Sequence, residues 1–91
     1  MGCYGDRENR DINGTLTNGH YTPEICNNEC TAGGYLYFGL QASDWCLCGN
    51  SYGKYGISTN CNLGCRPDSS KICGGLWANS VYKTSFVPDG M

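Results

Sequence analysis

Residues 45–50 read WCLCGN, which places two cysteines one residue apart. A second close pair, Cys26 and Cys30, lies within YTPEICNNEC at 21–30. In a strand, residues i and i+2 share a face and lie about 6.6 Å apart. In a helix, residues i and i+4 share a face and lie about 6 Å apart. A helix lying along the strand can therefore be joined to it by two parallel disulfides.

The expected chain direction selects the pairing. Thr22 suits the N-cap of a helix, Pro23 suits its first position, and the glycines at 33–34 suit its end. Two reversals then lead through a strand at 35–41 to a strand at 44–49, which should run parallel to the helix. This direction predicts the disulfides Cys26–Cys46 and Cys30–Cys48.

Length and composition predict one disulfide-rich domain. The chain has 91 residues, 8 cysteines and 14 glycines, and it is poor in Leu, Ile, Val and Phe. A chain of this size has a thin core, and an even cysteine count favours four crosslinks. Disulfides persist in oxidising compartments, so we expect a secreted protein or part of an ectodomain. MGCYGD at 1–6 lacks the apolar segment of a signal peptide, and we interpret Met1 as a start residue added to a mature domain.

Four cysteines remain after the first two disulfides, and their spacing alone leaves three pairings open. One of these closes the short loop from Cys65 to Cys73 and leaves Cys3 with Cys61. We expect no metal site, because Cys-x-Cys is not a usual zinc spacing and His20 stands alone. The acids Asp6, Asp11 and Asp68 do not have the spacing of an EF-type calcium loop.

The remaining segments complete the expected fold. Further strands are predicted around residues 3–4 and at 79–87, with polar loops at 6–20 and 50–75. The predicted fold is a small disulfide-rich α+β domain, an antiparallel sheet with one helix packed on one face.

Several functions are disfavoured by composition. The net charge of −2 comes without a basic stripe, which argues against nucleic acid as a partner. No apolar run approaches the roughly 20 residues that span a bilayer. A glycosidase needs two carboxylates across a cleft, and a triad needs a positioned histidine, whereas this chain has loop acids and His20. We therefore expect a binding module that is not an enzyme and has no cofactor.

Five stretches together resemble the WSC domain family: GCY-x-D at 2–6, YTPEICNNEC at 21–30, CLCGN at 46–50, NCNLGC at 60–65 and SSKICGGLWANSVY at 69–82. The resemblance covers residues 2–82, with all eight cysteines at family-like spacing. It implies a PAN/apple-like fold with the pairing Cys3–Cys61, Cys26–Cys46, Cys30–Cys48 and Cys65–Cys73. We accordingly expect a WSC-like domain at 2–84 and a C-terminal tail at 85–91.

The resemblance also implies a function. Family members are usually assigned carbohydrate binding, on cell walls or cell surfaces, whereas kremen-type members take part in protein assembly. The first hypothesis is thus a secreted, lectin-like module for a polysaccharide or cell-surface glycan. The alternative is a protein-interaction module of a larger ectodomain. A small lectin that stands alone would need to form homo-oligomers to gain avidity.

Strand alternation points to candidate binding residues. If Cys46 and Cys48 face the helix, Trp45 and Leu47 face away from it. By the same alternation, Leu36, Phe38 and Leu40 should pack beneath the helix, while Tyr35 and Tyr37 share the uncovered face with Trp45. The alternative for these rings is a second small core, covered by the N- and C-terminal segments.

Further candidates lie in loops. Tyr52 and Tyr55, in a Gly-rich loop, are expected to be exposed, and Trp77 could contact a ligand or plug Cys65–Cys73. Sugar hydroxyls could bind Asp44, Asp68, Arg66 or Asn50, although Gly-Asn also favours a turn. The predicted ligand-binding residues are Trp45, Tyr52, Tyr55, Trp77, Tyr37, Asp44, Asn50 and Arg66, and Asn13 begins a glycosylation sequon, Asn-Gly-Thr.

Overall fold

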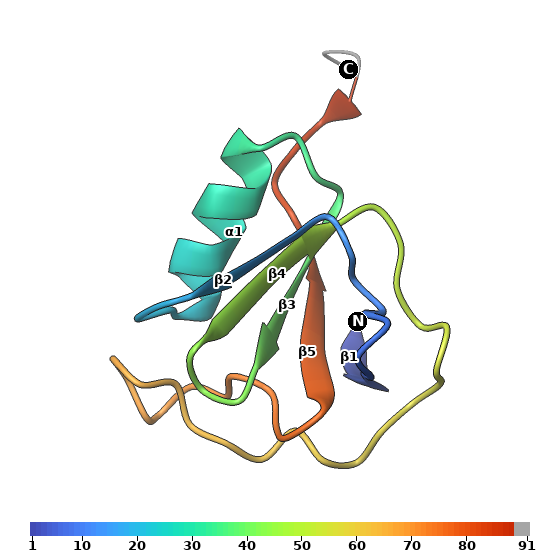
Figure 1. The fold of residues 1–91 in the computed structure, drawn as a ribbon. Coiled ribbons are helices and arrows are strands. Elements are labelled where there is room, and N and C mark those ends of the chain that lie inside the picture. Colours follow the sequence, from blue (N-terminus) through green and yellow to red (C-terminus); the bar gives the residue numbers. More distant parts are fainter. Residues whose placement is uncertain (89–91) are drawn as a thin grey trace.

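The computed structural model describes residues 1–88, which form an antiparallel sheet with a helix on one face (Figure 1). The strands run in the spatial order β1-β5-β3-β4-β2, and the helix lies against β3 and β4. The elements in chain order are β1 (Gly2–Gly5), β2 (Thr15–Asn18), α1 (Pro23–Ala32), β3 (Tyr37–Gln41), β4 (Trp45–Gly49) and β5 (Ala78–Lys83). The predicted α+β architecture is confirmed. Within the described residues, no helix has the length and apolarity needed to cross a membrane.

Helix α1 begins and ends where its capping residues predict. The Thr22 hydroxyl accepts a hydrogen bond from the Ile25 backbone N–H at 3.3 Å, and Pro23 is the first helical residue. Gly33 forms the C-cap, and Gly34 follows at φ 79°, a left-handed conformation in which glycine carries no steric penalty. The chain then reverses toward β3.

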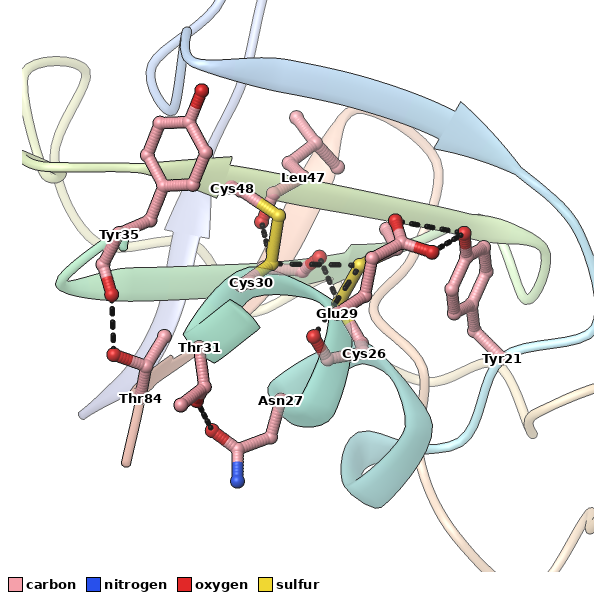
Figure 2. The surroundings of a disulfide bond; sticks show 12 residues. Tyr21, Cys26, Asn27, Glu29, Cys30, Thr31, Tyr35, Leu47, Cys48 and Thr84 are labelled. Carbon is pink, nitrogen blue, oxygen red and sulfur yellow. Dashed lines mark hydrogen bonds between the residues drawn. A yellow bond between two sulfur atoms is a disulfide. The ribbon is translucent and has the colours of Figure 1, made fainter. Parts of the chain in front are cut away.

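Two disulfides join the helix to β4, in the register that the spacing predicts (Figure 2). Cys26 pairs with Cys46 and Cys30 with Cys48, with Cα–Cα distances of 5.6 Å and 5.3 Å. All four residues are buried together with Phe38 and Leu40. Leu36, predicted to join them, is instead half-buried outside this cluster.

The other two disulfides tie the loops to the sheet. Cys3–Cys61 links β1 to the long loop after β4, with a sequence separation of 58, and Cys65–Cys73 closes a loop with a separation of 8. All four pairings are thus as the sequence resemblance implied.

Several predicted boundaries were wrong. Residues 15–18, placed in a polar loop, form β2 and pair with β4 at the edge of the sheet. Strand β5 ends at Lys83 rather than at 87, because the Ser85 backbone N–H binds the side chains of Asn27 and Thr31 on the helix. The predicted boundary after residue 84 stays a prediction, and residues 89–91 of the predicted tail lie outside the described residues.

The face opposite the helix carries a second small core. Ile12 packs there with Leu47 and Val81, all at most 1% exposed. A Cβ on Gly39 or Gly49 would come within 2.8 Å of the Ile12 side chain, so both positions need glycine for the N-terminal segment to reach the sheet. The second core predicted as the alternative is therefore present.

Strand alternation predicted Tyr35 on this face, but the side chain does not lie there. Tyr35 precedes β3 and packs against the disulfide-rich core on the helix side, where its backbone carbonyl accepts a hydrogen bond from Thr84 (Figure 2). The prediction failed because residue 35 is still in the turn after Gly34, where alternation does not apply.

A buried polar network fastens the N-terminal segment to the sheet. The Asp6 carboxylate accepts hydrogen bonds from the Asp11 backbone N–H at 2.8 Å, from Gln41 at 2.8 Å and from Arg10 at 2.9 Å. Gln41 also donates to Asn79 at 2.9 Å. Burial alone would raise the pKa of Asp6, but these hydrogen bonds outweigh it and hold the pKa below the ordinary value of 3.8.

Asp11 extends this network to the loop after β4. Its carboxylate accepts hydrogen bonds from the backbone N–H groups of Gly53 at 2.7 Å and Lys54 at 2.9 Å. The carboxylate oxygens of both Asp6 and Asp11 therefore accept hydrogen bonds within the fold.

Removing the Cys30–Cys48 disulfide with the double substitution Cys30→Ala, Cys48→Ala should lower the free energy of unfolding by about 3 kcal/mol, because the crosslink constrains the unfolded chain. Denaturant unfolding without reductant measures this loss. The matched variant Cys65→Ala, Cys73→Ala, whose loop is shorter, should lose less. A loss below about 1 kcal/mol at Cys30–Cys48 would contradict the structural role given to it.

The Asp6 network should make the fold sensitive to acid. As pH falls below the ordinary pKa of 3.8, the unfolded chain binds a proton at Asp6 before the folded chain does. Stability is therefore fully present above that pH and is lost as pH falls through the lower folded pKa. Asp6→Asn should lower stability by about 2–3 kcal/mol at neutral pH and flatten the acid dependence. Urea unfolding across acidic pH measures both effects, with exposed Glu8→Gln as the control; an unchanged acid dependence in Asp6→Asn would refute the assignment.

Candidate functional site

Both tryptophans of the chain line one shallow cleft, on the sheet side opposite the helix. The cleft has a volume of about 200 Å³. It is lined by Arg10, Gln41, Ala42, Trp45, Leu76 and Trp77. The sequence prediction thus named the two aromatic walls of the cleft, Trp45 and Trp77.

The two tryptophans are held in different ways. Trp45 is the first residue of β4, and strand alternation turns it away from Cys46 into partial burial against the second core. Trp77 lies just before β5 and is 51% exposed. The Arg10 guanidinium lies 5.0 Å from the centre of the Trp77 ring, a cation–π contact.

Strained backbone surrounds this cleft. Among the described residues, the positive φ angles of residues other than glycine belong to Ala42 at 52°, Ser43 at 69° and Trp77 at 54°. Ala42 and Ser43 form the turn between β3 and β4, and their N–H groups bind the carbonyls of Gly75 and Cys73. The carbonyl of Trp77 accepts a hydrogen bond from the Asp6 N–H at 2.9 Å. Such conformations persist where surrounding structure enforces them, and they are enriched at ligand sites.

The polar groups of the cleft are well fixed. Arg10 uses one guanidinium nitrogen, Nη1, to bind Asp6, which leaves further N–H donors for a ligand. Gln41 is 6% exposed and is held by Asp6 and Asn79. The cleft therefore combines two flat aromatic surfaces with a cationic hydrogen-bond donor.

The predicted tyrosines form a separate cluster. Tyr52 packs edge-on against Tyr4 and Tyr37, with ring centres 5.0 Å and 4.8 Å apart. Desolvation is the main cause that raises the pKa of Tyr52 above its ordinary value, and the neighbouring Tyr4 and Tyr37 raise it further. Tyr52 was expected to be exposed, but it is half-buried because its ring helps to cover the second core.

Tyr55 is also half-buried rather than freely exposed. Its hydroxyl donates to the carbonyl of Asn9, and the Arg7 guanidinium lies 4.5 Å from its ring centre. Tyr37 additionally lines a second groove of about 450 Å³, with Leu36, Lys83 and residues 84–88. This groove contains neither tryptophan.

The predicted polar residues lie apart from the cleft. Asp44 and Arg66 form a two-pronged ion pair, with nitrogen–oxygen distances of 2.5 Å and 2.7 Å. The hydrogen bonds from Arg66 hold the pKa of Asp44 below its ordinary value. Asn50 serves the fold as a turn residue, since its side chain accepts a hydrogen bond from the Leu36 N–H at 3.0 Å.

Four cleft residues were not found from the sequence: Arg10, Gln41, Ala42 and Leu76. Arg10 lies in a polar loop that has no periodic pattern, and Gln41 is one polar residue at the end of a strand. Leu76 adjoins Trp77 in CGGLW, and its 67% exposure could not be read from composition. Contacts between distant segments bring these residues together, which local patterns do not encode.

The sulfur atoms do not offer a metal site in the described part of the chain. Two groups of side chains come close enough to share an ion, Cys26, Cys30 and Cys46, and Glu29, Cys46 and Cys48. Every cysteine in them is in a disulfide, whereas metal binding needs a thiolate.

Comparison with known proteins places this fold in a family. The family model described as WSC domain matches residues 1–75. Xylosyltransferase oxt of Drosophila pseudoobscura pseudoobscura is 32% identical over 97 residues, covering 96% of this chain and 11% of that protein. Kremen protein 1 of Homo sapiens is 36% identical over 81 residues, covering 82% of this chain and 17% of that protein.

Protein SLG1 of Saccharomyces cerevisiae is 45% identical over 60 residues, covering 64% of this chain and 16% of that protein. The chain thus spans less than a fifth of the length of each of these three relatives. Because the family model covers most of the 91 residues, the chain belongs to the WSC domain family.

Proposed function

We propose that this chain is an extracellular carbohydrate-binding module and that the Trp45–Trp77 cleft receives the sugar. The observation that carries the proposal is the meeting of both tryptophans with Arg10 in one cleft. The four disulfides support an oxidising, extracellular location.

The chemistry of the cleft suits a glycan. A pyranose has an apolar C–H face that packs on an aromatic ring, while its hydroxyls need hydrogen-bond partners. Trp77 offers an exposed ring for this contact, and the free N–H groups of Arg10 lie beside it. Because Asp6 holds Arg10 in place, little side-chain entropy is lost on binding.

The size of the cleft sets the expected mode of binding. Its volume of about 200 Å³ lies below the roughly 300–1,000 Å³ of pockets that enclose a drug-sized ligand. One or two sugar rings would contact the protein while the rest of the glycan extends into solvent. Such contacts are weak singly, so several copies of the domain on one polysaccharide would bind by avidity.

A protein partner is the second candidate, and Leu76 is the observation that favours it. This side chain is 67% exposed directly beside Trp77. An exposed leucine next to a tryptophan and an arginine resembles the centre of a protein interface, where Trp and Arg are enriched. Kremen protein 1 has a region similar to this chain, and it is therefore a relative with which this alternative can be compared.

Trp77→Ala should weaken glycan binding about tenfold or more, because it removes the exposed stacking surface. Both tryptophans line the cleft, so intrinsic fluorescence reports on it directly, and Trp45 remains as reporter in the variant. Titration with soluble oligosaccharides of glucose, mannose, xylose and N-acetylglucosamine, after a glycan-array screen, measures the affinities. Trp77 is outside both cores, so the variant should keep the wild-type unfolding temperature.

The control for this experiment is Tyr82→Leu. Tyr82 is 38% exposed but stacks on Phe38, away from the cleft residues. The Tyr82→Leu variant should bind the oligosaccharides with the affinity of the wild type. If no oligosaccharide binds at millimolar concentration, or if Trp77→Ala binds unchanged, the cleft is not a glycan site.

Leu76→Asp should separate the two candidates. A sugar contacting Trp77 and Arg10 would lose no more than a few-fold in affinity, whereas an apolar protein interface would be disrupted by a buried, unpaired carboxylate. Parallel measurement of glycan binding and of binding to a purified ectodomain partner tests this. Equal loss of glycan binding in Leu76→Asp and Trp77→Ala would contradict the expected position of the sugar.

A further inference from the structure

The sheet has two edge strands, β1 and β2, and another segment of the chain covers the edge at β1. On the outer side of β1, the Gly5 N–H donates to the Gly56 carbonyl, and the Ser58 N–H donates to the Cys3 carbonyl, both at 3.0 Å. Ile57 forms a bridge to Tyr4 between them. The segment around residue 57 thus covers this edge, and the Cys3–Cys61 disulfide holds it there.

The outer side of β2 is bare within residues 1–88. The Gly19 N–H donates to the Asp44 carbonyl at 2.7 Å, in register with the β2–β4 ladder. Antiparallel ladders alternate, so Thr17 and Thr15 also bind β4, and the backbone groups of Leu16 and Asn18 point outward. In the described residues, no other segment forms a hydrogen bond with these outward groups.

The side chains of β2 do little to prevent another strand from pairing there. Its sequence, TLTN, contains no charge and no proline, the residues that commonly guard an edge. Leu16 is 43% exposed. The β2 strand of a second copy could pair antiparallel with this edge, with Leu16 of one copy opposite Leu16 of the other. Because β2 has no charged residue, no charge repulsion between the two strands would disfavour this pairing.

The glycosylation sequon leads directly into this edge. Asn13 and Thr15 are exposed, and Thr15 is the first residue of β2. Gly14 lies tightly between them, since a Cβ there would come within 2.3 Å of the Cys48 carbonyl and 2.5 Å of the Tyr35 ring. The contact with β4 fixes the sequon backbone on the sheet while the Asn13 side chain remains accessible.

We propose that Asn13 carries an N-linked glycan that shields the β2 edge from pairing with a second copy of the chain. The amide nitrogen of Asn13 forms a bond to the anomeric carbon of an oligosaccharide donated by a lipid-linked diphosphate. The bond between that carbon and the phosphate oxygen breaks, the amide loses a proton, and the lipid diphosphate leaves. The proposal needs secretion but does not depend on the Trp45–Trp77 cleft.

The distances suit this role. Asn13 lies three residues before Leu16, so the two are at most about 10 Å apart along the chain. In the symmetric pairing through Leu16, the chain just before β2 of one copy would approach Gly19 of the other. A branched, hydrated glycan at Asn13 would fill the space that the second copy needs.

The experiment begins with protein secreted from a eukaryotic cell. Intact mass before and after removal of N-glycans should show one glycan on the wild type and on Thr15→Ser, which keeps the sequon. Asn13→Gln and Thr15→Ala should show none. Peptide mapping then assigns the glycan to Asn13, and a wild-type mass without a glycan would overturn the proposal.

The shielding role is tested by sedimentation over a wide concentration range. The glycosylated protein should stay monomeric, whereas Asn13→Gln should form dimers whose share rises with concentration. Adding Leu16→Lys to Asn13→Gln places like charges opposite each other and should restore the monomer. If Asn13→Gln stays monomeric, or if its dimer persists with Leu16→Lys, the glycan does not guard this edge.

Discussion

The two disulfides between α1 and β4 are the constraint on which the rest of the structure depends. Among the described residues, six of the thirteen buried hydrophobic side chains are cysteines, and four of these six form Cys26–Cys46 and Cys30–Cys48. A chain this short and this poor in aliphatic residues gains only a thin margin of stability from apolar burial. Crosslinks that restrict the unfolded chain contribute the missing stability. They also fix the register of the helix along β4.

That register decides what the other face of the sheet can do. With Cys46 and Cys48 turned to the helix, Leu47 must enter the second core, and Trp45 must lie at its border. The N-terminal segment then covers the centre of this face through Ile12 and the Asp6 network. Trp45 is left at the rim, where Arg10 and Trp77 complete the cleft. The position of the candidate cleft is thus a consequence of the same alternation that builds the core.

The parts of the fold that could be predicted rest on local rules. Capping by Thr22, the match between i, i+4 and i, i+2 spacing, and strand alternation at residues 45–48 depend on neighbours in the chain, and each was confirmed. Strand β2 was missed because its four residues are all exposed and show no hydrophobic pattern. Tyr52 was expected to be free, since its neighbours in sequence are glycine and serine. Its packing partners, Tyr4 and Tyr37, come from two other strands.

The candidate site was predictable only in its aromatic half, because its polar half depends on tertiary contacts. Arg10 reaches Trp77 because Asp6 holds both residues. The Asp6 carboxylate accepts a hydrogen bond from Arg10, and the Asp6 backbone N–H donates to the Trp77 carbonyl. The left-handed conformations of Ala42 and Trp77 are costly for residues with side chains, at about 1–3 kcal/mol each. The segment at 73–75 restrains the turn that contains Ala42, and the Cys65–Cys73 disulfide restrains that segment in turn. A rigid, crosslinked frame can hold such conformations in the absence of ligand, so the proposed binding of a sugar in this cleft would require no further ordering of these residues.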